Sequence, residues 1–170
     1  SERVIESRKT TLNLLAKNHN FDCAHCAKFG KCEFLKMLTK YRINIGAYRT
    51  NKGRHEGIIE GTGICMDLSK CILCRRCETM CTEIQQVGVL SGVNRGFETK
   101  VSTFFNENLC DTNCSFCGQC VAVCPTAALS EVNNITHVWD ALNNKDKCTV
   151  VQIAPAVRVA LSGLTKLVLS

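Results

Sequence analysis

The pattern of apolar and polar positions begins with a helical segment. Residues 2–17 contain no Gly or Pro, and Ile5, Leu12 and Leu15 fall on one helical stripe. Ser1 stands where a capping residue is expected. A second, shorter helix is predicted over residues 33–40. The N-terminal part of the chain is therefore expected to be helical.

Further along the chain, apolar and polar residues alternate, as in a β-strand. Residues 87–105 alternate β-branched and polar positions around Asn94-Arg95-Gly96, which predicts a β-hairpin. Residues 149–154 form a short apolar run that predicts a buried strand, and Pro155 is placed to begin a helix. Between the helical and alternating parts, residues 41–62 are rich in Gly, Asn, Arg and Lys and indicate a boundary. We expect an α+β chain in three parts: residues 1–60, 61–147 and 148–170.

The high cysteine content changes the expectation of a large apolar core. The hydrophobic fraction of 45% includes 14 cysteines among 170 residues, so the material for an apolar core is smaller than it looks. Residues 1–10 show no secretory signal, which favours a reducing compartment, the cytoplasm or the matrix of an anaerobic organelle, and metal sites over disulfides. The most apolar stretch, residues 150–170, is interrupted by Gln152, Pro155, Arg158 and Lys166, so no membrane span is expected.

The cysteines repeat in a fixed frame. C-x2-C-x2-C-x3-C occurs at residues 71–81 and again at 114–124, offset by 43 residues. In two-cluster ferredoxins the fourth cysteine of such a frame ligates the other cluster. Zinc sites present paired C-x2-C elements and do not use two such frames. We therefore assign one 4Fe–4S cluster to Cys71, Cys74, Cys77 and Cys124, and a second to Cys114, Cys117, Cys120 and Cys81. Thr82 follows the first frame where the ferredoxin pattern has the proline that Pro125 supplies to the second.

A third set combines His19 with Cys23, Cys26 and Cys32 in the spacing H-x3-C-x2-C-x5-C. Four such ligands suit zinc or a third cube, and the two neighbouring frames favour the cube. A neutral imidazole in place of a thiolate makes the cluster less negative and should raise its potential. His25 lies in the same loop as a competing ligand.

The clusters also change the charge balance. An oxidised cube carries roughly −2 with four cysteines and about −1 with one histidine, so three clusters nearly cancel the formal charge of +6. The Lys and Arg residues are spread along the chain, and a nucleic-acid partner is not expected. The remaining cysteines, Cys65, Cys110 and Cys148, are expected to be small packed side chains.

The whole motif order resembles the accessory electron-transfer region of FeFe hydrogenases. The similar phrases are DLSKCILCRRCETMC, NRGFETKV, DTNCSFCGQCVAVCPTAAL and VVQIAPAVRVAL, the last like the start of that family's catalytic domain. The resemblance implies a relay of three 4Fe–4S clusters between a ferredoxin-like redox partner and a hydrogenase catalytic domain or subunit. It places the Cys114 cluster nearest the active site and the His19 cluster outermost. The family's later TSCCP and PCxxK motifs, which hold the di-iron site, do not follow Cys148, so no catalytic residue is assigned.

Other functions stay open. A similar histidine-ligated unit occurs in the large iron–sulfur subunit of respiratory complex I and in diaphorase subunits of NAD-linked hydrogenases. A non-catalytic assembly module could use clusters or zinc as folding staples, with residues 149–170 as a docking element. A chain that retains hydrogenase activity by itself is the third hypothesis.

Overall fold

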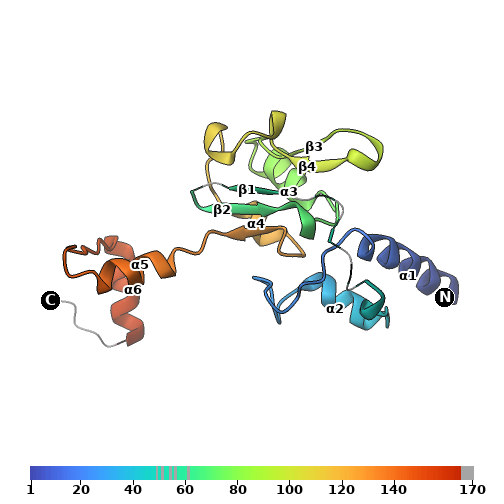
Figure 1. Cartoon of the computed structure of the whole chain (residues 1–170), viewed down its shortest axis with the longest axis horizontal. Coiled ribbons are helices and arrows are strands. Elements are labelled where there is room, and N and C mark those ends of the chain that lie inside the picture. The colour runs from blue at the N-terminus through green and yellow to red at the C-terminus, as the bar shows by residue number, and fades with distance from the viewer. Residues whose placement is uncertain (49, 51, 54, 56, 61, 166–170) are drawn as a thin grey trace. The chain divides into compact units, whose positions relative to one another are not determined.

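The computed structural model describes residues 1–48, 50, 52–53, 55, 57–60 and 62–165. It divides into two compact units, Ser1–Val132 and Asn133–Ser170. Unit 1 mixes short helices with two small antiparallel sheets (Figure 1), which agrees with the predicted α+β class. The finer division into three parts stays a prediction.

Unit 1 begins with the two predicted helices, α1 (Glu2–Ala16) and α2 (Glu33–Lys40). Their apolar faces meet in a small core, in which Leu12, Ala16, Phe34 and Leu38 are buried. Figure 1 shows the two helices near each other, and the short 3₁₀ turn η1 (Ile45–Tyr48) follows α2 along the chain. The Ser1 side chain makes no capping bond.

A three-stranded sheet lies at the centre of unit 1. Strands β1 (Ile58–Glu60), β2 (Ile64–Asp67) and β5 (Leu129–Glu131) pair antiparallel in the order β1-β2-β5, with Met66 opposite Leu129. The sequence did not reveal these strands, because three or four residues are too short for a periodic signal. The pairing places the end of the second cysteine frame beside the start of the first.

The predicted hairpin is confirmed. Strands β3 (Ser91–Val93) and β4 (Lys100–Ser102) pair antiparallel across the loop that contains Asn94 and Gly96, both with positive φ. Helix α3 (Arg76–Thr79) continues directly into the π-helical turn η3 (Met80–Ile84), and α4 (Gln119–Val123) packs against both. The remaining 3₁₀ turns are η2 (Leu68–Lys70), η4 (Gly96–Glu98), η5 (Phe104–Asn106) and η6 (Leu109–Asp111).

Unit 2 contains α5 (Ile135–Asn143), which the sequence analysis did not predict, and α6 (Pro155–Thr165), which begins at the predicted proline. The strand predicted at residues 149–154 is wrong: the segment forms no strand, and Val150 and Val151 are 83% and 76% exposed. An apolar run becomes a buried strand only beside a partner strand. Cys110 and Cys148 are also exposed, contrary to expectation. Among the described helices none is long and apolar enough to span a membrane.

Gly53 closely approaches the segment that leads into the first cysteine frame. An added Cβ would lie 2.3 Å from the backbone oxygen of Ser69, and Gly53 has φ +88°. We expect Gly53→Ala to destabilise the protein by about 1–3 kcal/mol and to lower its melting temperature by several degrees. Thermal unfolding followed by circular dichroism measures the effect. Gly63→Ala is the control, because no described atom lies within 4 Å of its Cβ. Equal melting temperatures for both variants would contradict the prediction.

Candidate iron–sulfur sites

The two cysteine frames share one backbone conformation. Leu73 and Phe116, 43 residues apart, have φ of 56° and 51°. The same offset relates Arg75 and Gly118, with φ of 58° and 72°, and relates the first residues of α3 and α4. A non-glycine residue in this region costs of order 1 kcal/mol and persists where its surroundings impose it. Each frame is therefore a preformed loop followed by a helix that carries its third cysteine.

The second frame lines an apolar cavity with a cysteine from the first. Cys114, Cys117 and Cys120 share this cavity with Cys81 from η3. Ile64, Leu109 and Leu129 complete much of its wall. The structure thus brings together the four cysteines of this predicted set.

The first frame shows the reciprocal arrangement. Cys71, Cys74 and Cys77 line a second cavity with Cys124, which ends α4. Met66, Val101 and Leu129 also line it. Each frame therefore contributes three cysteines to one cavity and its fourth cysteine to the other.

The N-terminal loop forms a third cavity, lined by His19, Cys23, Cys26 and Cys32. The His19 side chain is buried, whereas the competing His25 side chain is 84% exposed and its Nδ1 donates to Asp22 at 2.9 Å. Cys32 caps α2, and the amide of Leu35 donates to its sulfur at 3.3 Å. This arrangement favours His19 over His25 as the fourth side chain of the set.

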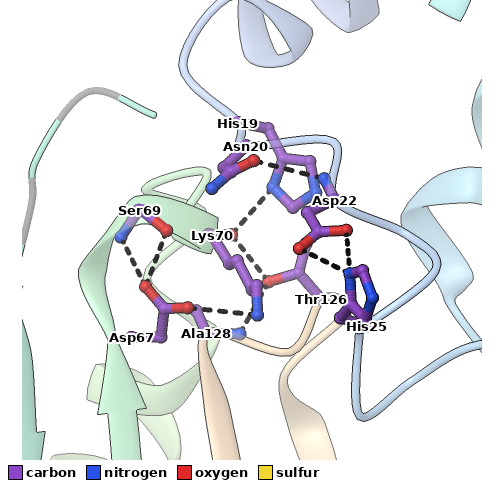
Figure 2. Close-up of polar contacts among 9 residues, drawn as sticks. All are labelled: His19, Asn20, Asp22, His25, Asp67, Ser69, Lys70, Thr126 and Ala128. Atoms are coloured by element: carbon purple, nitrogen blue, oxygen red, sulfur yellow. Dashed lines mark hydrogen bonds and ion pairs between the residues drawn. The ribbon is translucent and has the colours of Figure 1, made fainter. Parts of the chain in front are cut away.

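The environment of His19 suits a metal ligand. Its Nδ1 lies 3.0 Å from the carbonyl oxygen of Lys70, as Figure 2 shows. A carbonyl can only accept, so Nδ1 carries the proton and Nε2 keeps a free lone pair. Burial lowers the pKa of His19 below its ordinary value of 6.5, although the bond to Lys70 acts in the opposite direction. The imidazole is therefore neutral at pH 7, the form that binds metals.

Three of the frame thiols, those of Cys71, Cys77 and Cys120, keep their protons as long as no cation is bound. Burial raises the pKa of Cys77 to about 12 and those of Cys71 and Cys120 to about 11, and neighbouring cysteines add to the effect. A thiol must lose its proton to bind a metal, and the metal's charge reverses the local preference. An iron–sulfur core is such a group, and its binding would release these protons.

The spacing of the side chains around each cavity is that expected for a cluster and not for a single metal ion. Among the described residues no group of three His, Cys, Asp or Glu side chains converges as the ligands of one metal ion would. Instead, four side chains surround each cavity. A 4Fe–4S cluster is held this way, by one protein ligand on each of its four irons. The four side chains around each cavity are therefore of a kind that could hold such a cluster.

One six-residue segment touches all three cavities. Cys124 and Thr126 line the cavity of the first frame, Ala127 lines the N-terminal one, and Leu129 lies between those of the two frames. The backbone at Cys124 also accepts a hydrogen bond from the Lys28 ammonium of the N-terminal loop. Sequence reasoning missed Lys70, Thr126 and Lys28, because their contacts join backbone carbonyls, which leave no trace in residue types.

Comparison with known proteins gives these sites a context. Residues 8–45 match the NADH-ubiquinone oxidoreductase-G iron-sulfur binding region, and residues 61–130 match the ferredoxin-like domain of NADH-quinone oxidoreductase subunit 3. The structure also resembles an NAD⁺-reducing [NiFe]-hydrogenase, with a TM-score of 0.62 and 20% identity, over 77% of this chain and 56% of that one. At this identity the likeness shows the fold alone.

Three curated relatives illustrate the kinds of protein to which the chain is similar. The NADP-reducing hydrogenase subunit HndD of Solidesulfovibrio fructosivorans is 50% identical over 95% of this chain, and iron hydrogenase 1 of Clostridium pasteurianum is 33% identical over 96%. An NADH-quinone oxidoreductase subunit of Rhizobium meliloti is 36% identical over 74%. The chain spans 28%, 29% and 15% of their respective lengths. Residues 8–45 and 61–130 are thus an iron–sulfur binding region and a ferredoxin-like domain of the NADH oxidoreductase type, and the relatives of the chain are hydrogenase subunits and subunits of NADH-quinone and NADH-ubiquinone oxidoreductases.

Proposed function

We propose that this chain transfers single electrons through three 4Fe–4S clusters, as the electron relay of an FeFe hydrogenase. The outer cluster is held by His19, Cys23, Cys26 and Cys32. The middle cluster is held by Cys71, Cys74, Cys77 and Cys124, and the inner cluster by Cys81, Cys114, Cys117 and Cys120. When bound, each cluster takes up and gives back one electron at a potential set by its ligands, hydrogen bonds and burial.

The observation that carries this proposal is the shared segment 124–129. Because it contributes to the wall of every cavity, a few residues separate each site from the next. The wall between the two frame cavities includes Leu129, which is 1% exposed. The chain thus brings the three sites close together in sequence, which is what an electron relay requires.

The extent of the matches favours a hydrogenase. The two hydrogenase relatives match 95% and 96% of the chain, so both matches extend into residues 149–170. The NADH-quinone oxidoreductase relative matches 74%. The alternative, an iron–sulfur subunit of an NADH dehydrogenase or NAD-linked hydrogenase, is favoured by the descriptions of the two matching regions. The longer matches outweigh those descriptions.

Each end of the relay has its own redox partner. A ferredoxin-type one-electron carrier exchanges electrons at the His19 site, and a hydrogenase catalytic domain or subunit exchanges them at the Cys114 site. Residues 148–170 are the start of that catalytic part, and no catalytic residue is assigned to this chain. Its compartment is the cytoplasm or the matrix of an anaerobic organelle.

Metal analysis and redox titration of anaerobically prepared protein test the proposal together. We expect about twelve irons and about twelve sulfides per chain, since each cube contains four of each. Reversible reduction signals are expected from all three sites. Fewer irons would refute the three-cluster count, and bound zinc would support structural staples. A full iron content with no reversible signal would favour the assembly module over the relay.

A further inference from the structure

The Lys70 carbonyl joins the outer and middle sites. It accepts one hydrogen bond from Nδ1 of His19 at 3.0 Å and another from the hydroxyl of Thr126 at 3.0 Å, as Figure 2 shows. Lys70 directly precedes Cys71, and Thr126 follows Cys124 by two residues. A single backbone oxygen therefore connects the histidine of one ligand set to neighbours of two cysteines in the next.

The Thr126 hydroxyl has a second possible acceptor. Its oxygen lies 3.6 Å from the sulfur of Cys124, and the amide of Ala128 donates to it at 3.2 Å. Thr126 is 1% exposed, so water does not compete for these bonds. A cysteine that binds metal is a thiolate and can only accept. The single hydroxyl proton then serves either Lys70 or Cys124, while the Ala128 amide holds the oxygen in place.

We propose that Thr126 is a positioning residue that couples the potentials of the outer and middle sites by dividing one hydroxyl proton between the Lys70 carbonyl and the Cys124 sulfur. This inference rests on the proposed ligand sets. When one electron leaves the outer site and arrives at the middle site, the Cys124 sulfur becomes more negative and attracts the hydroxyl. No proton is gained or lost, because the hydroxyl only turns.

Rotation of the Thr126 hydroxyl stabilises opposite redox states at the two sites. A hydrogen bond to a ligand sulfur stabilises the reduced middle site. The Lys70 carbonyl then accepts from His19 alone, which strengthens that bond, makes the imidazole a better electron donor and stabilises the oxidised outer site. Both effects favour movement of the electron from the outer site to the middle one.

The test is an EPR-monitored redox titration of the full chain loaded with iron and sulfide. Thr126→Val keeps the shape and removes the hydroxyl. We expect both potentials to shift to more negative values, because Cys124 loses a donor and His19 bonds permanently to an unshared carbonyl. Thr126→Ser should titrate as the wild type does. Thr103→Val is the matched control, since Thr103 is equally buried and its hydroxyl donates to the Glu107 carbonyl.

Three results would overturn the inference. The first is a pair of unchanged potentials in a Thr126→Val protein with full iron content. The second is an equal shift in Thr126→Ser, which would assign the effect to packing of the methyl group. The third is loss of iron from both Thr126→Val and Thr126→Ala, which would make Thr126 an assembly residue. Failure of the relay itself is distinguishable, because the wild type would then lack reversible signals.

Discussion

Replacing His19 by alanine is expected to remove one cluster and leave two. The side chain is buried and lines the N-terminal cavity, and its hydrogen bond from Nδ1 to Lys70 leaves the lone pair of Nε2 available for a metal. Without it the loop offers three cysteines to a cluster that needs four ligands. Iron content should fall from about twelve to about eight per chain, and one reduction signal should disappear. Iron and sulfide analysis with redox titration measures both.

Two further variants make this result specific. His19→Cys restores four ligands with an added negative charge, so the cluster should persist at a lower potential. His25→Ala is the matched control: it removes a histidine from the same loop whose exposed side chain bonds only to Asp22 among the described contacts. If His25→Ala removes the signal and His19→Ala does not, the ligand assignment is wrong.

The cysteine frames were predictable from the sequence because ligation is local. A cluster requires thiolates at short fixed spacings, and such loops recur wherever the spacing recurs. Helices α1, α2 and α6 and the hairpin were predictable for a similar reason, since each has a periodic pattern, a proline start or a turn signal of its own. The strand predicted at residues 149–154 was wrong because an apolar pattern is a local feature. Whether such a segment becomes a buried strand depends on a partner strand elsewhere in the fold.

The contacts between the sites were beyond sequence reasoning. Lys70 acts through its backbone oxygen and Thr126 through a bond to that oxygen across 56 residues, so neither residue type announces the contact. The short strands β2 and β5 create this proximity, because they pair residues 64–66 with residues 129–131, close to Lys70 and Thr126 along the chain. The sequence thus indicates which residues can bind clusters, whereas the pairing of the strands determines which of these ligand sets lie next to one another.

The exchange of the fourth cysteine between frames gives the most stringent test of the two inner sites. Cys81 lies in the π-helical turn η3, a wider turn than an α-helix and one that often marks functional positions. It shares a cavity with Cys117 and not with the cysteines of its own frame. We therefore expect Cys81→Ala to damage the inner cluster and to leave the middle cluster intact.

A set of paired variants identifies which cluster is lost without prior assignment of the signals. Cys81→Ala should lose the same reduction signal as Cys117→Ala, and Cys124→Ala should lose the same signal as Cys74→Ala, each with a fall of up to four irons per chain. Cys110→Ala, which changes an exposed cysteine between the frames, should keep about twelve irons. If Cys81→Ala instead matches Cys74→Ala, each frame binds its own cluster with all four cysteines. That outcome would refute the inner and middle ligand sets together, because both depend on the same exchange.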